Sequence, residues 1–260
     1  MDLFSLWRNE IEQHHPVAIA TVIEGPSVGA KIFVGEFVEP QGSFGDPDLD
    51  RVVIRDLLGE LAAGRTSVRH YGFQGQARET DVAVFFECFA PPPRMVIFGA
   101  VDFTAALVNV AKLLGYTVTV CDAREVFATK RRFPKADEVI VQWPHKYLEQ
   151  VGSTLTGRDA ICVLTHDHKF DVPAVMAALQ TEVGYIGAMG SRRTSEERMK
   201  RLGEAGADLD AVAARLHAPI GLNLGGRTPE ETAIAICAEI IAVRTGRQAA
   251  SLRDATGSLH

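Results

Sequence analysis

Three consecutive prolines at 91–93 divide the chain into two parts with different patterns of apolar residues. Prolines in a row favour an extended connector and cannot lie inside a helix or a central strand. Beyond them, short apolar runs alternate with stretches whose apolar positions recur at helical spacing. This alternation predicts a parallel sheet with helices on both faces, an α/β fold with a Rossmann-like, doubly wound domain over residues 94–246. The expected strands are 95–98, 117–121, 138–141, 160–165 and 185–186, and the expected helices include 102–114, 145–151 and 172–179.

Before the prolines, residues 1–90 predict a smaller α+β domain. Apolar positions at helical spacing predict helices over 3–14 and 50–63. Apolar runs separated by glycine- and proline-bearing turns predict four strands, over 17–24, 31–38, 68–71 and 82–89. Residues 91–93 then form a linker, and the polar residues 247–260 are expected to form a frayed tail.

The composition argues against several classes of partner. Of the 260 residues, 47% are hydrophobic and 23% are charged, as is ordinary for globular proteins, and the net charge is −6. A negative chain is unsuited to nucleic acid or to an anionic membrane surface. Its apolar runs are shorter than the roughly 18 residues of a transmembrane helix, and it starts with an amphipathic pattern rather than a signal peptide. The four cysteines lack C-x-x-C spacing, so we expect free thiols in a cytoplasmic protein.

Two glycine-bearing loops, 187–190 and 221–226, each lead into a helix start. The first start is predicted from a T-x-x-E capping box at 194–197, and the second from T-P-E-E at 228–231. Free backbone N–H groups and the helix dipole allow such a start to bind an anion. The candidate ligand contacts in these loops are Gly190, Gly221 and Asn223.

The most promising phosphate-binding residues are Ser191, Arg192 and Arg193, which come just before the first predicted helix start. Guanidinium groups bind phosphate through two parallel hydrogen bonds and stay charged at every relevant pH. This pattern suits a small molecule that bears a phosphate. The alternative is a solvated basic patch that balances Glu196 and Glu197.

The first strand-to-helix turn of the second domain departs from a dinucleotide-binding fingerprint. Gly99 is present, but Val101 and Thr104 replace the other two glycines of G-x-G-x-x-G. The acidic residue expected after the next strand is present as Asp122. Tight NAD(P) binding is therefore disfavoured, and the turn either borders another ligand or serves packing alone.

A second polar turn, T-H-D-H at 165–168, follows the apolar run 160–164. In an extended conformation, His166 and His168 point the same way and could share a metal, with Asp167 or Asp171 nearby. The alternative is that these groups bond within the loop and cap a helix that begins near Asp171. We prefer the alternative, because H-x-H alone is weak evidence for a metal.

Several longer runs carry a resemblance to a known family. They are PPPRMVIFGA (91–100), THDHKFDVPAV (165–175), GAMGSRRT (187–194), LHAPIGLNLGGRTPEE (216–231) and, less closely, ATVIEGPSVGAKIFV (20–34). In this order they resemble the XdhC/CoxI family of accessory proteins for xanthine dehydrogenase and carbon monoxide dehydrogenase. The resemblance covers most of residues 17–246.

The resemblance implies a maturation factor that carries the molybdenum cofactor and does not itself turn over a substrate. Family members are understood to bind this cofactor, a pterin with a dithiolene and a phosphate, and to help deliver it, sulfurated, to an apo molybdenum hydroxylase subunit. By this resemblance residues 191–193 hold the phosphate, while Gly99, Asp122 and the 166–168 loop border the pterin or the metal. A homodimer also fits the family.

Two loops of the first domain depart from the family pattern. Many members have a G-G-G-C run where this chain has residues 42–47, and no cysteine occurs before Cys88. A shorter run at 26–29 also replaces the family's S-P-R-P-x-G. Two alternatives therefore stay open: an NAD(P)-dependent oxidoreductase, and a protein that docks a partner although its ligand pocket has decayed.

Overall fold

The chain divides into two units, Met1–Pro91 and Pro92–His260. The computed structural model describes residues 3–35, 38–76, 79–165 and 167–254. None of the helices in these ranges is both long and apolar enough to cross a membrane.

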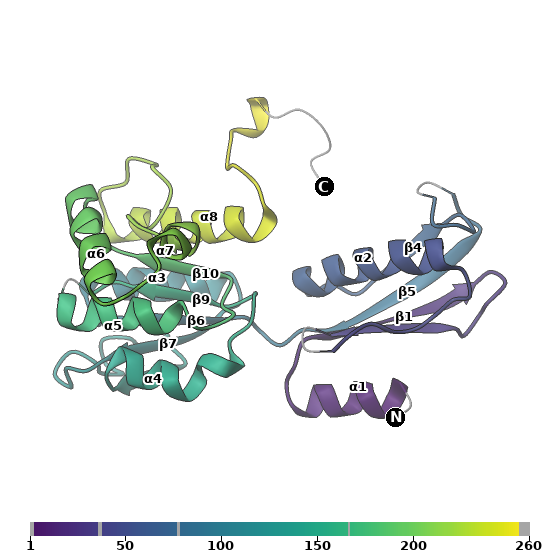
Figure 1. Ribbon diagram of the computed structural model, residues 1–260, viewed down its shortest axis with the longest axis horizontal. Helices are drawn as coiled ribbons and strands as arrows, with labels where there is room; N and C mark the ends of the chain where they lie inside the picture. The colour runs from purple at the N-terminus through teal and green to yellow at the C-terminus, as the bar shows by residue number, and fades with distance from the viewer. Residues whose placement is uncertain (1–2, 36–37, 77–78, 166, 255–260) are drawn as a thin grey trace. The chain divides into compact units, whose positions relative to one another are not determined.

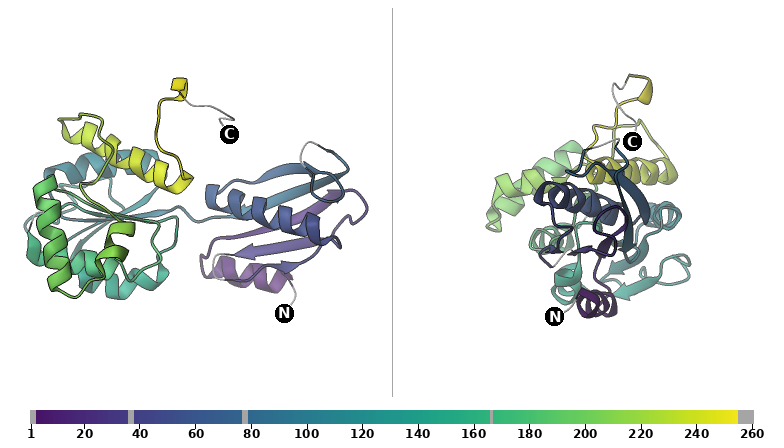
Figure 2. Two further views of the ribbon diagram at one scale, coloured as in Figure 1. Left: turned by 45° about the horizontal axis from the view of Figure 1, so that its top comes forward. Right: turned by 90° about the vertical axis from the view of Figure 1, so that its right-hand side faces the viewer.

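The N-terminal unit is an antiparallel sheet with one helix on each face (Figures 1 and 2). The strand order is β3-β2-β1-β5-β4. The strands are β1 (Val17–Glu24), β2 (Lys31–Gly35), β3 (Gln41–Gly42), β4 (Ser67–Tyr71) and β5 (Val82–Phe89), and the helices are α1 (Leu3–Glu12) and α2 (Pro47–Ala63). Val53, Leu57 and Leu61 of α2 pack on one face, while Trp7 of α1 lies edge-on to Phe33 of β2, with ring centroids 6.2 Å apart. Helix α2 begins three residues earlier than predicted, because the Asp46 side chain caps it.

The C-terminal unit is a six-stranded parallel sheet, which confirms the predicted α/β fold class. Its strand order is β11-β10-β9-β6-β7-β8. The strands are β6 (Arg94–Phe98), β7 (Thr117–Asp122), β8 (Glu138–Val141), β9 (Ala160–Val163), β10 (Tyr185–Ala188) and β11 (Leu216–His217). The helices are α3 (Asp102–Leu113), α4 (Pro144–Val151), α5 (His168–Ala178), α6 (Arg192–Glu204), α7 (Leu209–Arg215) and α8 (Pro229–Thr245), with short 3₁₀ turns at Gly152–Thr154 and Leu252–Asp254.

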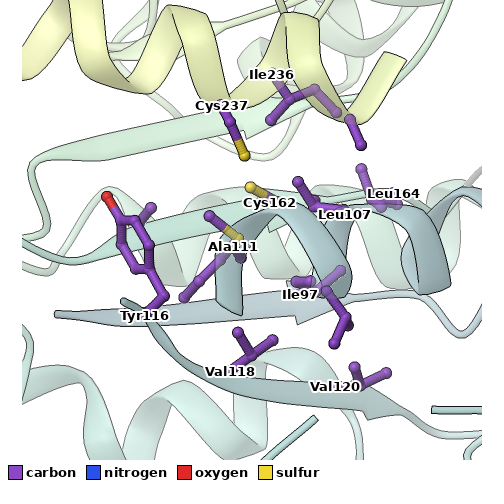
Figure 3. Packing of buried hydrophobic residues seen from close by; sticks show 14 of the residues in the cluster. Ile97, Leu107, Ala111, Tyr116, Val118, Val120, Cys162, Leu164, Ile236 and Cys237 are labelled. Carbon is purple, nitrogen blue, oxygen red and sulfur yellow. The ribbon is translucent and has the colours of Figure 1, made fainter. Parts of the chain in front are cut away.

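The period-2 alternation of the strands sends their side chains into two separate cores. In β6, Met95 and Ile97 face α3 and α8, whereas Val96 and Phe98 face α4 and α5. Figure 3 shows the first of these cores, in which Ile236 and Cys237 of α8 pack over the sheet and α3. Strand β9 is apolar throughout and β6 is apolar after Arg94, as strands buried on both faces of a parallel sheet generally are. The two cores fix the sheet, and with it the edge at which the candidate site residues lie.

Candidate functional site

The candidate residues follow the carboxyl ends of neighbouring strands, where a doubly wound sheet binds its ligands. The strand order reverses at β6, which has β7 on one side and β9 on the other. Backbone hydrogen bonds continue past the strand ends and join the segments that follow β6, β9, β10 and β11 to the neighbouring strands. They run from Gly99 N to Cys121 O (3.0 Å), Leu164 N to Phe98 O (2.7 Å), Met189 N to Val163 O (2.8 Å) and Ile220 N to Ala188 O (3.0 Å).

Gly99 lies where the β6–α3 turn crosses the chain that leaves β9. Its φ is +114°, and a Cβ built there would lie 2.8 Å from Thr165 N and 3.1 Å from Leu164 C. A side chain at this position would therefore collide with backbone. Thr104, which replaces the last fingerprint glycine, is buried and donates its hydroxyl to Gly99 O at 2.5 Å. Close approach of two backbones thus explains Gly99 without a ligand.

Both carboxylate oxygens of the acidic residue at the end of β7 accept hydrogen bonds from neighbouring residues. Asp122 is 4% exposed, and its Oδ2 accepts the Ala100 N–H at 2.8 Å. Arg124 donates its Nε to Oδ1 at 2.9 Å and its Nη2 to Oδ2 at 2.7 Å. Burial raises the pKa of Asp122, but the hydrogen bonds from Arg124 and Ala100 outweigh it, so the pKa lies below its ordinary value. Asp122 is a charged structural group, and this supports the prediction that tight NAD(P) binding is disfavoured.

The start of α3, at the point where the strand order reverses, is held by an arginine from the β7–β8 loop. Val101 is the N-cap, and no side chain from the described part of the chain caps the helix. Arg132 donates Nη1 to Ala100 O at 2.8 Å, and its Nη2 lies 3.4 Å from Asp102 Oδ1. This loop, residues 123–137, was not singled out from the sequence, although its K-R-R run at 130–132 is a visible signal.

The T-H-D-H turn is placed differently from its prediction. His166 lies outside the described residues. Asp167 caps α5 by accepting the Lys169 N–H at 3.0 Å, and His168 is the exposed first residue of that helix. The preferred alternative, that this turn caps a helix, is therefore confirmed, but the helix begins at His168, three residues before the predicted start, and His168 is helical rather than extended. In the ranges that the structure describes, no three His, Cys, Asp or Glu side chains lie together as a metal site requires.

The turn from β10 to α6 carries the predicted phosphate residues on its surface. Ser191 is the N-cap of α6, and its Oγ accepts the Thr194 N–H at 3.1 Å. The capping box predicted at Thr194 is thus wrong, because the helix begins two residues before it. Arg192 and Arg193 lie in the first turn, where they point into solvent; Arg193 is 87% exposed and pairs with Glu197 at 3.0 Å. Gly190, at a φ of +155°, leaves room for the Thr194 side chain.

Beneath this turn lies a buried ion pair that the sequence did not reveal. Arg198 of α6 is 1% exposed, and its Nε lies 2.8 Å from both carboxylate oxygens of Asp171 on α5. Its Nη2 donates to Met189 O at 2.6 Å, whereas its Nη1 has no hydrogen-bond partner among the described residues. The pair ties the start of α5 to the turn before α6. The sequence signal is an arginine four residues before Leu202, within the buried stripe of α6.

The second glycine-bearing loop, residues 221–226, is anchored to α8. Gly221 has a φ of +96°, and its N–H donates to Glu239 Oε2 at 2.8 Å. The same oxygen accepts the Tyr185 hydroxyl at 2.5 Å. Asn223 is exposed on the loop that follows. Helix α8 begins as predicted, with Thr228 and Glu231 forming a capping box.

Comparison with known proteins decides the family. A model of the XdhC Rossmann domain matches residues 95–240, and a model of the XdhC and CoxI family matches residues 10–72. The chain belongs to the XdhC family. This confirms the resemblance carried by the sequence motifs.

Three relatives and a solved structure place this XdhC protein more closely. A probable subunit of xanthine dehydrogenase from Bacillus subtilis is 32% identical over 161 residues, 62% of this chain and 46% of that protein. The uncharacterized protein YqeB of Escherichia coli is 26% identical over 258 residues, 94% of this chain and 46% of YqeB. The E. coli molybdenum cofactor insertion chaperone PaoD is 32% identical over 85 residues, 33% of this chain and 26% of PaoD. The chain thus spans less than half the length of these curated relatives.

The solved structure shows that the fold is shared. It is described as a xanthine dehydrogenase from Bacillus halodurans and superposes with a TM-score of 0.53 at 22% identity. The match covers 97% of this XdhC chain and 98% of that one.

Proposed function

We propose that this XdhC protein binds the molybdenum cofactor and helps to insert it into an apo molybdenum hydroxylase, as a carrier rather than as an enzyme. Family membership and the name of PaoD support this role. The main support for a binding site comes from the start of α6. There Arg192 and Arg193 follow the Ser191 cap at the carboxyl edge of the sheet. Backbone N–H groups and two guanidinium groups there suit the phosphate of the pterin.

The donor set fits the phosphate end of the cofactor. Helix N–H groups and arginines bind oxyanions, whereas the described residues contain no cluster of metal-binding side chains. When bound, the cofactor would supply its metal through its own dithiolene. The protein would supply position: the Asp171–Arg198 pair, through Met189 O, fixes the turn that carries the two surface arginines.

The proposal extends to the surroundings of this site. Gly99, Asp122 and the turn at 166–168 would border the pterin, and Gly190, Gly221 and Asn223 would line the approach to it. Residues 1–90 and 94–246 would act as separate domains joined by the linker at 91–93. We further propose that the protein works in the cytoplasm as a homodimer, and that its partner is the apo form of a molybdenum hydroxylase subunit.

Analysis of the bound cofactor tests the proposal. The protein is purified anaerobically from a host that makes the cofactor, and molybdenum and oxidised, fluorescent pterin are measured. We expect near-stoichiometric pterin in the wild type and strong loss in an Arg192→Ala/Arg193→Ala variant. Arg201→Ala is the matched control, because it removes a surface arginine from the last turn of the same helix.

Three results would contradict the proposal. Equal pterin content in the double variant and the Arg201→Ala control would show that the start of α6 does not hold the phosphate. Saturable NADH binding without pterin would favour an oxidoreductase, although the fully bonded Asp122 carboxylate argues against it. Binding of a hydroxylase subunit without any pterin would favour a docking protein with a decayed pocket.

A further inference from the structure

The β7–β8 loop is a basic segment in an acidic chain. Residues 123–137 contain five lysines and arginines against two acidic residues, whereas the whole chain has a net charge of −6. Two of these arginines lie against one ring: the guanidinium carbon of Arg124 is 4.7 Å from the Phe127 centroid, and that of Arg132 is 5.6 Å from it. Phe127 nevertheless stays 39% exposed.

A second aromatic group continues this arrangement across the starts of α4 and α5. The centroids of Trp143 and Phe170 lie 4.8 Å apart. Lys169 Nζ is 5.8 Å from the Trp143 centroid and 5.1 Å from that of Phe170. Arg124, at 6.0 Å from Phe170, joins the two groups. We call this set the cation–aromatic surface: Arg124, Phe127, Arg132, Trp143, Lys169 and Phe170.

The cation–aromatic surface adjoins the end of the sheet where its strand order reverses. A narrow hollow there is lined by Gly99, Cys121, Asp122, Ala123, Pro144, Thr165 and Phe170. Phe170, one of the lining residues, is buried, Arg124 follows Ala123 in the chain, and Trp143, 42% exposed, precedes Pro144. Neighbouring Val126 is 75% exposed. Phe127, Trp143 and Val126 are thus exposed to solvent near this hollow. Three cations, Arg124, Arg132 and Lys169, lie against the aromatic rings.

We propose that the cation–aromatic surface binds a planar heteroaromatic ring that carries a phosphate. Exposed aromatic faces stack with such rings, and arginine and lysine bind the phosphate. Asp122 does not repel an anion here, because Arg124 and the Ala100 N–H neutralise and occupy its carboxylate. The inference deepens the proposed function, since a pterin phosphate has this chemistry, but a nucleotide has it too.

Trp143 supplies the assay. The chain has two tryptophans, Trp7 and Trp143, so a Trp7→Phe variant leaves Trp143 as the single reporter. Its emission is followed, with correction for absorbance and with calorimetry in parallel, during titration with 6-hydroxymethylpterin phosphate and with guanosine monophosphate. Inorganic phosphate and guanosine serve as the charge-only and ring-only probes. We expect saturable binding of at least one ring phosphate, at least about tenfold tighter than either partial probe.

Three substitutions in the Trp7→Phe protein identify the surface. Lys169→Ala should weaken binding about tenfold, the effect expected when a charged hydrogen bond to phosphate is lost. Phe127→Ala should weaken it several-fold through lost stacking. Lys146→Ala is the matched control, because it removes an exposed α4 lysine that pairs with Glu149 and lies three residues after Trp143.

The outcomes separate this inference from the proposed function. If the pterin phosphate or the nucleotide binds more tightly than inorganic phosphate and guanosine, the inference is supported. The one of the two that binds more tightly then identifies the kind of ring that the surface recognises. Absence of binding by both, or equal effects of Lys169→Ala and Lys146→Ala, overturns it. If binding is absent but purified protein loses pterin in the Arg192→Ala/Arg193→Ala variant, the proposed function stands without this surface. If a ring phosphate binds in the titration but the Arg192→Ala/Arg193→Ala variant keeps its pterin, the cation–aromatic surface is supported and the proposed site at the start of α6 is wrong.

Discussion

Removing Asp171 should destabilise the C-terminal unit more than any loss of a surface ion pair. The Arg198 side chain is 1% exposed, and Asp171 lies 2.8 Å from its Nε. In an Asp171→Ala variant the guanidinium keeps its bond to Met189 O, but its charge stays buried without the carboxylate. Breaking a buried pair in this way costs about 3–5 kcal/mol.

This loss in the free energy of unfolding corresponds to a decrease in the melting temperature, Tm. For a domain of roughly 150–250 residues, each kcal/mol shifts Tm by about 2–4 °C. Asp171→Ala should therefore lower the Tm of the C-terminal unit by about 6–20 °C. Urea unfolding followed by Trp143 emission in a Trp7→Phe protein isolates this unit, since Trp143 lies in it.

Two further variants show whether the buried charge causes the loss. An Asp171→Leu/Arg198→Met protein buries no charge and should lose much less stability than Asp171→Ala. Arg193→Ala removes a pair of similar length from the same helix, but Arg193 is 87% exposed, so its loss should cost at most about 0.5 kcal/mol. A cost below about 1 kcal/mol for Asp171→Ala, or a double variant as unstable as the single one, would refute the reasoning.

Three other predictions concern single sites. Gly99→Ala should lower the free energy of unfolding by well over the roughly 1–2 kcal/mol that a positive φ costs an alanine, because the new Cβ would also lie 2.8 Å from the backbone nitrogen of Thr165. Gly115→Ala is the control, since its φ is +83° and its Cβ would meet open space. In urea unfolding it measures the cost of the backbone conformation alone. Because the pKa of Asp122 in the folded protein lies below its ordinary value of 3.8, the ionised carboxylate should stabilise the fold at pH values above 3.8. This stabilisation should be lost as the pH falls through the pKa of the folded protein. The difference in the free energy of unfolding between wild type and Asp122→Asn should therefore become smaller from pH 7 to pH 3. A difference that stays constant would contradict a lowered pKa for Asp122. Burial raises the pKa of the Cys88 thiol to about 11, and the other three cysteines are buried; native protein at pH 7 should therefore react slowly with a thiol reagent, at Cys88 first, and rapid modification of all four would be inconsistent with this packing.

The alternation of short apolar runs and helical stretches was enough to predict the parallel sheet, because each buried strand must be apolar on both faces. The cap of α8 was predictable for a similar reason: Thr228 and Glu231 satisfy each other within one turn of chain. The cap of α6 was not. Ser191 and Thr194 both stand where a cap is plausible, and only the course of the chain leaving β10 decides between them.

The contacts that the sequence did not predict are those between distant segments. Arg198 and Asp171 are 27 residues apart and meet because α5 and α6 pack side by side on the same face. The arginines of the 123–137 loop reach the Gly99 turn only after the sheet has formed. Local patterns carry no information about such pairings, since periodicity specifies a face and not its partner.

Asp122 shows how one residue can keep its place in a fold while the chemistry of the edge changes. An acidic residue at the end of the second strand ordinarily accepts hydrogen bonds from a ribose. Here Arg124, two residues on, occupies both carboxylate oxygens, and the Ala100 N–H takes a further position on Oδ2. The edge that would have offered acceptors to a sugar therefore presents guanidinium groups and exposed rings. Under the two proposals above, the start of α6 suits the negative charge of a ligand, whereas the cation–aromatic surface suits both its charge and its planar ring.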